Sequence, residues 1–154
     1  MINVIDGDLL ESNADIICHQ VNCQGKMNSG IAKQIREKYP EVFNRYADLC
    51  STFLFNKSEL LGHCQVVDMP NGKAVANLFA QLEYGYDGKQ YTNLDALKNA
   101  MTKLKDLYCS TSTVIAFPYG IGSVRGGAKF EDVYEIIENV FKDFTVELWR
   151  LDKG

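Results

Sequence analysis

The interpretation of this chain begins with the stretch His19-Gln20-Val21-Asn22-Cys23-Gln24-Gly25-Lys26-Met27-Asn28-Ser29-Gly30-Ile31-Ala32. It follows the apolar run 14–18, which is typical of a buried strand, and it leads into the helical pattern of residues 31–36. A strand, a small polar loop and a helix N-terminus together predict an anion-binding cradle. Unpaired backbone N–H groups and the positive end of the helix dipole both face such a loop. We therefore expect a phosphorylated small molecule to bind there.

Strand and helix patterns alternate along the whole chain. Strands are expected at residues 2–5, 15–18, 63–69, 73–80, 113–117 and 144–151. Helices are expected at residues 31–38, 41–50, 92–108 and 130–141, with Thr92 as the N-cap of the third. This interleaving predicts an α/β layered fold with a mixed sheet. Because no linker or repeat interrupts the pattern, residues 1–154 are expected to form one domain.

Composition narrows the possible functions. The 154 residues carry a net charge of −4 and have a pI of about 5.2. Such an acidic balance argues against non-specific nucleic-acid binding, which needs a basic face. No membrane association is expected, because the sequence has no apolar stretch of membrane-spanning length and no signal peptide is apparent. The five cysteines are odd in number and contain no C-x-x-C pair, which favours a cytoplasmic location without a metal site or another cofactor.

Three polar residues near the ends of predicted strands are candidates for chemistry. Asp8 is either a turn or N-cap aspartate, or an acceptor for an exocyclic amine such as that of adenine. His19 is either a buried histidine with satisfied hydrogen bonds or a general base, acid or nucleophile at the C-terminal edge of a central strand. Asn22 offers both a donor and an acceptor to a pair of sugar hydroxyls.

A second glycine-rich loop, residues 118–127, follows the predicted central strand. Its four glycines within eight residues let the backbone approach a ligand closely and turn N–H groups inward. No Gly-Lys-Ser/Thr follows, so the loop is not a Walker P-loop. Two such loops, each between a strand and a helix, indicate a diphosphate ligand. The tyrosines and glycines of residues 84–92 form either a lid over this site or a plain hairpin.

At these residues the chain resembles the macrodomain family, whose members bind ADP-ribose and its derivatives. The resemblance runs from Gly7-Asp8-Leu9 through the first loop to residues 118–127 and the last helix and strand. The motifs most similar to the yeast-type ADP-ribose 1″-phosphate phosphatase branch are His19-x-x-Asn22-Cys23-x-Gly25, Ser29-Gly30-Ile31-Ala32, Tyr39-Pro40 and Leu60-Leu61-Gly62-x-Cys64. The resemblance implies a three-layer α/β/α macrodomain with a central mixed sheet.

The resemblance also implies a role for each candidate residue. Asp8 and the Leu9 amide would hold adenine, and Asn22 would orient the distal ribose. His19 would activate water or protonate the leaving oxygen, so His19 and Asn22 are the expected catalytic residues. The other expected ligand-binding residues are Ser29, Gly30 and Ile31 on the first loop and Pro118, Gly120, Ile121, Gly122, Ser123, Val124 and Arg125 on the second. Arg125 is either a contact for the terminal phosphate or a solvated loop arginine.

The leading hypothesis is hydrolysis of ADP-ribose 1″-phosphate to ADP-ribose and phosphate. The alternatives are removal of ADP-ribose from ADP-ribosylated macromolecules, deacylation of acyl-ADP-ribose, and non-catalytic binding of ADP-ribose-type nucleotides. The related glutamyl-ADP-ribose hydrolase branch relies on a lysine at the end of the strand that here carries Ala80-Gln81, and on an aspartate in the second loop. Here the chain has no acid after Pro118 until Glu131, which argues against that branch.

Overall fold

A computed structural model describes residues 1–123 and 126–151 of the chain. Six strands form one mixed sheet in the order β1 (Ile2–Asp6), β6 (Thr145–Arg150), β5 (Val114–Pro118), β2 (Ile16–Asn22), β4 (Ala74–Gln81) and β3 (Cys64–Asp68). Neighbouring strands are parallel except β3, which is antiparallel to β4. The alternating pattern of the sequence therefore predicted the fold class correctly.

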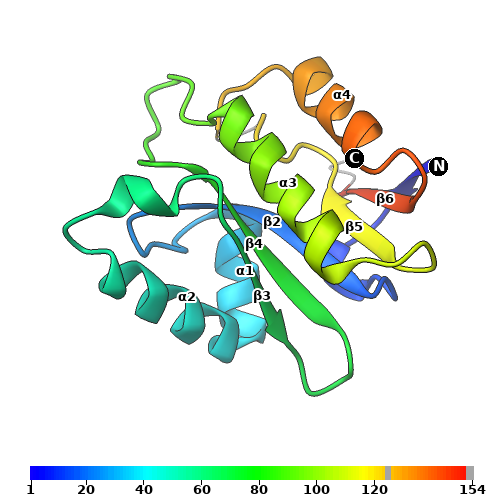
Figure 1. The fold of residues 1–154 in the computed structure, drawn as a ribbon, viewed down its shortest axis with the longest axis horizontal. Helices are drawn as coiled ribbons and strands as arrows, with labels where there is room; N and C mark the ends of the chain where they lie inside the picture. The colour runs from blue at the N-terminus through cyan, green and yellow to red at the C-terminus, as the bar shows by residue number, and fades with distance from the viewer. Residues whose placement is uncertain (124–125, 152–154) are drawn as a thin grey trace.

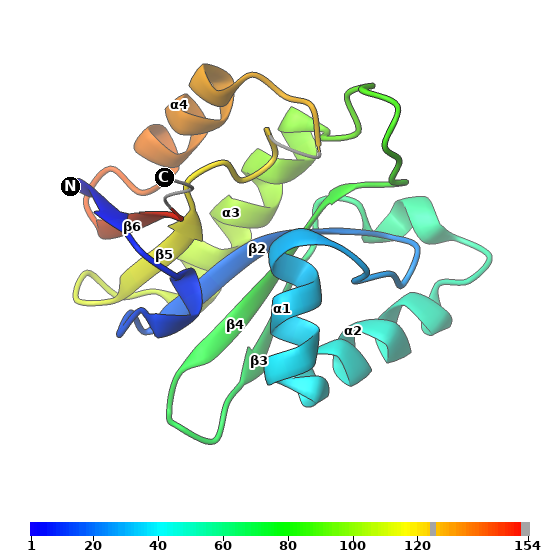
Figure 2. The same cartoon turned by 180° about the vertical axis from the view of Figure 1, so that it is seen from behind.

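Helices cover both faces of the sheet. α3 (Leu94–Tyr108) and α4 (Phe130–Val140) lie on the face toward the viewer in Figure 1. α1 (Gly30–Lys38) and α2 (Pro40–Thr52) lie on the opposite face, which Figure 2 turns toward the viewer. Two short 3-10 helices, η1 (Leu9–Glu11) and η2 (Lys57–Leu60), occur in connections and were not expected from the sequence. The three-layer α/β/α arrangement is thereby confirmed.

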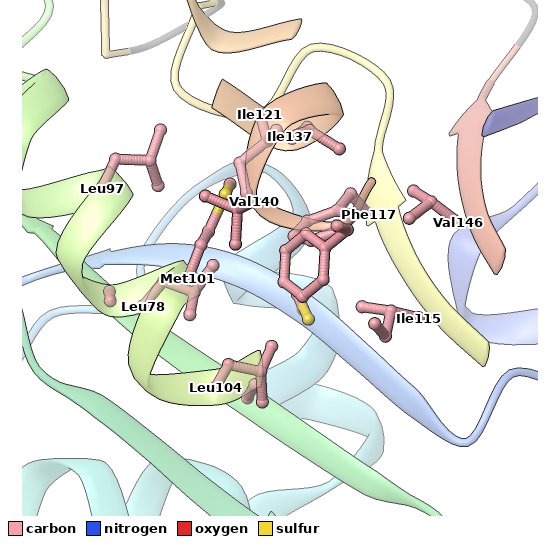
Figure 3. Packing of buried hydrophobic residues seen from close by; sticks show 14 of the residues in the cluster. Leu78, Leu97, Met101, Leu104, Ile115, Phe117, Ile121, Ile137, Val140 and Val146 are labelled. Atoms are coloured by element: carbon pink, nitrogen blue, oxygen red, sulfur yellow. The ribbon is translucent and has the colours of Figure 1, made fainter. Parts of the chain in front are cut away.

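The sheet divides the hydrophobic core into two clusters. Leu78 of β4 points into the cluster beneath α3 and α4, whereas the next residue, Phe79, points into the cluster beneath α1 and α2. This alternation is the period-2 geometry of a strand that is buried on both faces. Figure 3 shows Leu97, Met101 and Leu104 of α3 gathered against the side chains of α4 and β5. No helix in the described part of the chain has the length and apolarity that crossing a membrane requires.

Strand β2 continues four residues beyond the predicted end at Cys18 and includes the polar residues His19, Gln20 and Asn22. These residues stay in the strand because they remain paired with β4, through a register shift between Val21 and Asn22. The expectation that the strand ends before the polar stretch is therefore wrong. As a consequence, His19 lies in the middle of a strand rather than at its edge.

The predicted N-cap of α3 is also wrong by one residue. Asn93 caps the helix, because its side-chain oxygen accepts a hydrogen bond from the backbone N–H of Ala96. Thr92 instead forms an isolated antiparallel bridge with Gln81 at the end of β4. This bridge closes the loop of residues 82–91 at its base and leaves the Thr92 hydroxyl available for other contacts.

The parallel topology determines where a site can form. β1, β6, β5, β2 and β4 run in the same direction, so the segments that follow them meet at one edge of the sheet. Both glycine-containing loops of the sequence leave strands at this edge. The carboxyl edge of a parallel sheet is where ligands of open α/β folds bind.

Candidate functional site

A cavity of about 490 Å³ lies along this carboxyl edge and is of the size that a small-molecule ligand requires. It is lined by the turn after β1, the end of β2, the loop that leads into α1, the loop after β4, the loop after β5 and the end of β6. The cavity therefore crosses five of the six strands. Segments that are far apart in the sequence face one another across it.

The first loop ends at the N-terminus of α1, which faces the cavity. Ser29 is the N-cap residue but its side chain makes no capping hydrogen bond. Within the described residues, no acceptor pairs with the backbone N–H groups of Gly30, Ile31 or Ala32. All four residues line the cavity. Unpartnered amides and the helix dipole give this wall a positive potential, as the sequence predicted.

The second loop faces the first, but its backbone is folded differently from the prediction. The Ile121 N–H donates to the Pro118 carbonyl at 3.0 Å, and the Ser123 N–H donates to the Gly120 carbonyl at 3.0 Å. The Ser123 amide is used in this turn and Ser123 does not line the cavity, so the structure does not bring this residue together with the other expected contacts. Gly120 and Gly122 do line the cavity, and their N–H groups have no acceptor among the described residues.

The predicted residues Val124 and Arg125 lie outside the residues that the structure describes. Pro118 and Ile121 line the cavity as expected, although Ile121 is almost completely buried. The second wall of the cavity therefore consists of the segment from Pro118 to Gly122, together with Gly126.

The turn after β1 forms one end of the cavity. One carboxylate oxygen of Asp8 accepts a hydrogen bond from the Leu10 N–H at 3.0 Å and so caps η1. Asp8 and Leu9 also line the cavity, next to Trp149 of β6. Asp8 can therefore be both an N-cap residue and a ligand contact, because its carboxylate has a second oxygen that can accept a hydrogen bond from a ligand.

Asn22 lies at the end of β2 and organises the loop that follows it. Its Oδ1 accepts a hydrogen bond from the Gln24 N–H at 2.9 Å, and its Nδ2 donates to the Lys26 carbonyl at 3.0 Å. The hydroxyl of the buried Tyr46 donates to the main-chain carbonyl of Asn22 at 2.6 Å and lies 2.8 Å from Asn22 Oδ1. Asn22 lines the cavity, so the amide is held in place beside any ligand there.

His19 does not reach the cavity. Its side chain is 0% exposed, and its Nε2 donates to Asn77 Oδ1 of the neighbouring strand at 2.6 Å. Asn77 in turn donates to Gln65 Oε1 of β3 at 3.0 Å. The expectation that His19 lies at the mouth of the cradle is therefore wrong. The alternative of a buried histidine describes its position, but its hydrogen bonds are only partly satisfied, because Nδ1 has no partner among the described residues. The polar side chains of three adjacent strands thus form one hydrogen-bonded row inside the fold.

Burial determines how His19 titrates. Desolvation lowers the pKa of His19 from 6.5 to about 4, although the hydrogen bond to Asn77 acts in the opposite direction. At neutral pH the ring is therefore uncharged. A base with so low a pKa is poorly matched to proton transfer near pH 7.

We expect this pKa to make the stability of the chain depend on pH. The unfolded chain binds a proton at His19 below pH 6.5, but the folded chain does so only near pH 4. The free energy of unfolding should therefore fall as the pH drops from 6.5 to 4, by about 3 kcal/mol in total. Urea titrations at several pH values measure this dependence. In H19Q, the part of the pH dependence that His19 contributes should be lost. H63Q, which replaces a histidine on the surface, is the matched control. An unchanged pH dependence in H19Q would contradict the assignment.

The loop of residues 82–91 covers the end of the cavity next to β4. Tyr84 and Tyr86 line the cavity although both are exposed, and the Tyr86 hydroxyl donates to Ser29 Oγ at 3.3 Å. The bridge between Gln81 and Thr92 closes the base of the loop. The loop is therefore both a hairpin-like connection and an aromatic wall, which the sequence left as alternatives.

Several lining residues were missed from the sequence, among them Gln20, Lys26 and Gln81. Gln20 lies near the end of β2, Lys26 follows that strand, and Gln81 ends β4. Their place near the carboxyl edge was the available signal. Lys26 is exposed, and its ammonium group forms no ion pair with a described residue. It is the charged side chain nearest in sequence to Asn22 among the lining residues.

Cys23, which follows β2, is not activated as a nucleophile. Cys23 is fully buried, and desolvation raises its pKa to about 12, so its thiol stays protonated at neutral pH. In the ranges 1–123 and 126–151, no three His, Cys, Asp or Glu side chains come together as metal ligands would.

The chain is similar to known proteins of one family and fold. The sequence model of the family described as "Macro domain" matches residues 18–137. The ADP-ribose 1″-phosphate phosphatase of Debaryomyces hansenii is 34% identical over 123 residues, covering 70% of this chain and 68% of the yeast protein. The DNA ADP-ribosyl glycohydrolase of Mycobacterium tuberculosis is 26% identical over 152 residues, covering 92% of this chain.

The chain spans only 39% of the length of that mycobacterial relative. A solved structure described as the macrodomain of Mycobacterium tuberculosis DarG superposes with a TM-score of 0.78 at 24% identity, covering 99% of both chains. This likeness concerns the fold.

Proposed function

Since this chain belongs to the macrodomain family, we propose that its cavity binds ADP-ribose and that the chain hydrolyses ADP-ribose 1″-phosphate to ADP-ribose and inorganic phosphate. The yeast-type relatives with this printed activity support the choice of substrate. The amide donors on two walls of the cavity support the mode of binding.

The single observation that carries the proposal is that two sets of unpartnered backbone amides lie on opposite walls of the cavity. The Gly30, Ile31 and Ala32 amides belong to the N-terminus of α1, and those of Gly120 and Gly122 belong to the loop after β5. A diphosphate presents acceptor oxygens on both sides, so it suits a cleft with donors on both walls. The described lining includes one carboxylate, that of Asp8, which belongs to the turn after β1 and to neither of the two amide-bearing segments.

The order of the strands sets the direction of the ligand. Asp8 at the β1 end would accept a hydrogen bond from the adenine amine, next to Trp149. The diphosphate would lie between α1 and the loop after β5. The distal ribose would then reach the ends of β2 and β4, where Asn22 and Gln81 line the cavity.

Lys26 gives this distal end its positive charge. An ammonium group attracts a terminal phosphate more strongly than it attracts a neutral ribose hydroxyl, and it stabilises the charge that develops during phosphoryl transfer. In the reaction, water adds to phosphorus, the bond from phosphorus to the ribose oxygen breaks, and that oxygen takes up a proton. Asn22 would orient the ribose through the free N–H of its amide, because its oxygen is already committed to the loop.

His19 is assigned to the scaffold in this proposal. Its side chain is buried behind the strand and bonded to Asn77, so it neither contacts the substrate nor exchanges protons with it. Catalysis would instead rest on the aligned amides, Lys26 and a bound water, which is preorganised electrostatic stabilisation rather than general base catalysis by a side chain.

The exposed rim favours a second candidate function. Tyr84 and Tyr86 are exposed where the distal ribose would lie, so a macromolecule attached at C1″ could leave the cavity past them. The mycobacterial relative acts, by its name, on ADP-ribosylated DNA. Removal of ADP-ribose from a macromolecule is therefore the activity to compare with the phosphatase.

Turnover measurements with K26A test the proposal. We expect the kcat/KM for ADP-ribose 1″-phosphate to fall by about 10- to 100-fold, the size of one charge-assisted hydrogen bond, while ADP-ribose affinity changes less than about threefold. K33A is the matched control, because Lys33 is exposed on α1 but does not line the cavity. A wild type that releases no phosphate from ADP-ribose 1″-phosphate but releases ADP-ribose from labelled DNA or protein is the opposite result. That result would contradict the phosphatase proposal and support the second candidate function.

A further inference from the structure

A chain of hydrogen bonds beneath the second loop links it to the ends of β2 and β4. Gln20 Nε2 donates to Thr92 Oγ1 at 2.8 Å, and the Thr92 hydroxyl donates to the Gly122 carbonyl at 2.8 Å. The Ala128 N–H donates to the same carbonyl at 3.1 Å. We infer that Gln20 and Thr92 are positioning residues that hold the Gly122 carbonyl away from the diphosphate of bound ADP-ribose, an inference that rests on the proposed function.

The direction of the Gln20 amide follows from its neighbours. Gln81 Nε2 donates to the Glu83 carbonyl, so Gln81 Oε1 accepts where it meets Gln20 at 2.7 Å. The Thr92 proton is used on Gly122, so Thr92 Oγ1 also accepts from Gln20. Both contacts require the NH₂ group of Gln20. Reversing this amide would place oxygen against oxygen twice.

This orientation leaves Gln20 Oε1 buried with no donor among the residues that the structure describes. An unsatisfied buried acceptor is destabilising, so the amide is a poor choice for stability alone. The contribution that offsets this cost is the NH₂ group, which orients the Thr92 hydroxyl toward Gly122. Gln20 therefore acts on the ligand through Thr92 and the loop.

The orientation of the Gly122 carbonyl affects ligand binding because Gly122 lies at the cavity. Gly122 lines the cavity with a φ of +74°, and its N–H is one of the unpartnered donors of the loop. The peptide group that follows it is held at both ends, by Thr92 and Ala128 at the oxygen and by Gly120 at the Ser123 N–H. If the peptide turned over, a carbonyl oxygen would face the diphosphate, and two negative groups would repel each other.

Binding of ADP and adenosine to T92V, T92S and Q20M tests the inference. T92V and Q20M should weaken ADP binding by about five- to tenfold, the size of one neutral hydrogen bond. Binding of adenosine, which lacks phosphate, should change less than twofold, roughly the scatter of such interactions. T92S keeps the hydroxyl and should restore ADP binding. T102V is the matched control, because the Thr102 hydroxyl donates to the Lys98 carbonyl in an exposed hydrogen bond within α3.

The outcomes separate this inference from the proposed function. Equal losses for ADP and adenosine, or ADP binding unchanged in both T92V and Q20M, would overturn the positioning role. Because Gln20 Oε1 is unsatisfied, Q20M should also keep the urea midpoint of the wild type. A lower midpoint with unchanged ADP binding would show a structural role only. A wild-type chain that binds neither ADP nor ADP-ribose would overturn the proposed function itself.

Discussion

Replacing Gly126 with alanine should reduce ADP-ribose affinity by about a hundredfold. A Cβ at this position would overlap Thr92 Oγ1 and would lie 2.6 Å from the Gly122 carbonyl oxygen. The threonine can rotate, but the backbone carbonyl cannot move without displacing the loop. The free protein can relax by this displacement, whereas the bound state must compress the loop again, at a cost of about 3 kcal/mol.

G72A separates this effect from a loss of stability. Gly72 lies in the turn between β3 and β4, where a Cβ would meet nothing within 4 Å but would be strained by a φ of +83°. G72A should therefore lower the free energy of unfolding by about 1 kcal/mol without changing ADP-ribose affinity. Calorimetric titration of both variants makes the comparison. Wild-type affinity in G126A would mean that the loop after β5 does not hold the ligand.

Replacing His19 with alanine should lower the free energy of unfolding by about 4 kcal/mol. The change removes a fully buried ring, and it leaves Asn77 Oδ1 without its donor at 2.6 Å. A cavity and an unsatisfied acceptor then occur at the same place. Urea unfolding at pH 7.5 measures the loss, and the matched change H63A, at an exposed histidine, should cost less than about 0.5 kcal/mol.

The H19Q variant decides whether His19 has any catalytic role. Glutamine can still donate to Asn77, so this variant should fold even if H19A does not. We expect its kcat for ADP-ribose 1″-phosphate to stay within about threefold of the wild type, because the ring contacts no substrate. If kcat instead falls by about a hundredfold or more at saturating substrate, while the stability of the variant is unchanged, His19 is a catalytic residue.

The fold was predictable because periodicity reports burial directly. The apolar runs near residues 75–80 and 114–117 gave β4 and β5, and the stripe in α4 gave a helix within one residue of its observed end. The end of β2 was not predictable from apolarity, because this strand continues through polar residues that bond to other buried side chains. At the end of β2, hydrogen bonds to residues distant in the sequence hold the polar side chains in the strand. A prediction from hydrophobic periodicity cannot detect such contacts.

The placement of His19 was recoverable from a finer use of the same rule. Its neighbours at two-residue spacing, Ile17 and Val21, are both buried in the cluster beneath α1 and α2. A continuous strand therefore puts His19 on the same buried face. The sequence interpretation ended the strand too early and so treated the histidine as part of the loop.

Other features of the site had no local signal at all. Gln20 and Thr92 are 72 residues apart in the chain, so their hydrogen bond depends on strand order rather than on any motif. The turn that occupies the Ser123 amide depends on the carbonyl of Gly120. Glycine content predicted a loop whose backbone approaches a ligand with its N–H groups turned inward, but it could not say which of these N–H groups remain available.

Calorimetric titration of the wild-type chain with ADP-ribose tests the central claim most directly, because the two amide walls are proposed to hold its diphosphate. We predict one binding site per chain, competition by ADP, and binding about a hundredfold weaker in G126A but not in G72A. Absence of binding heat and of thermal stabilisation at millimolar ADP-ribose, or binding that G126A leaves unchanged, would contradict the account.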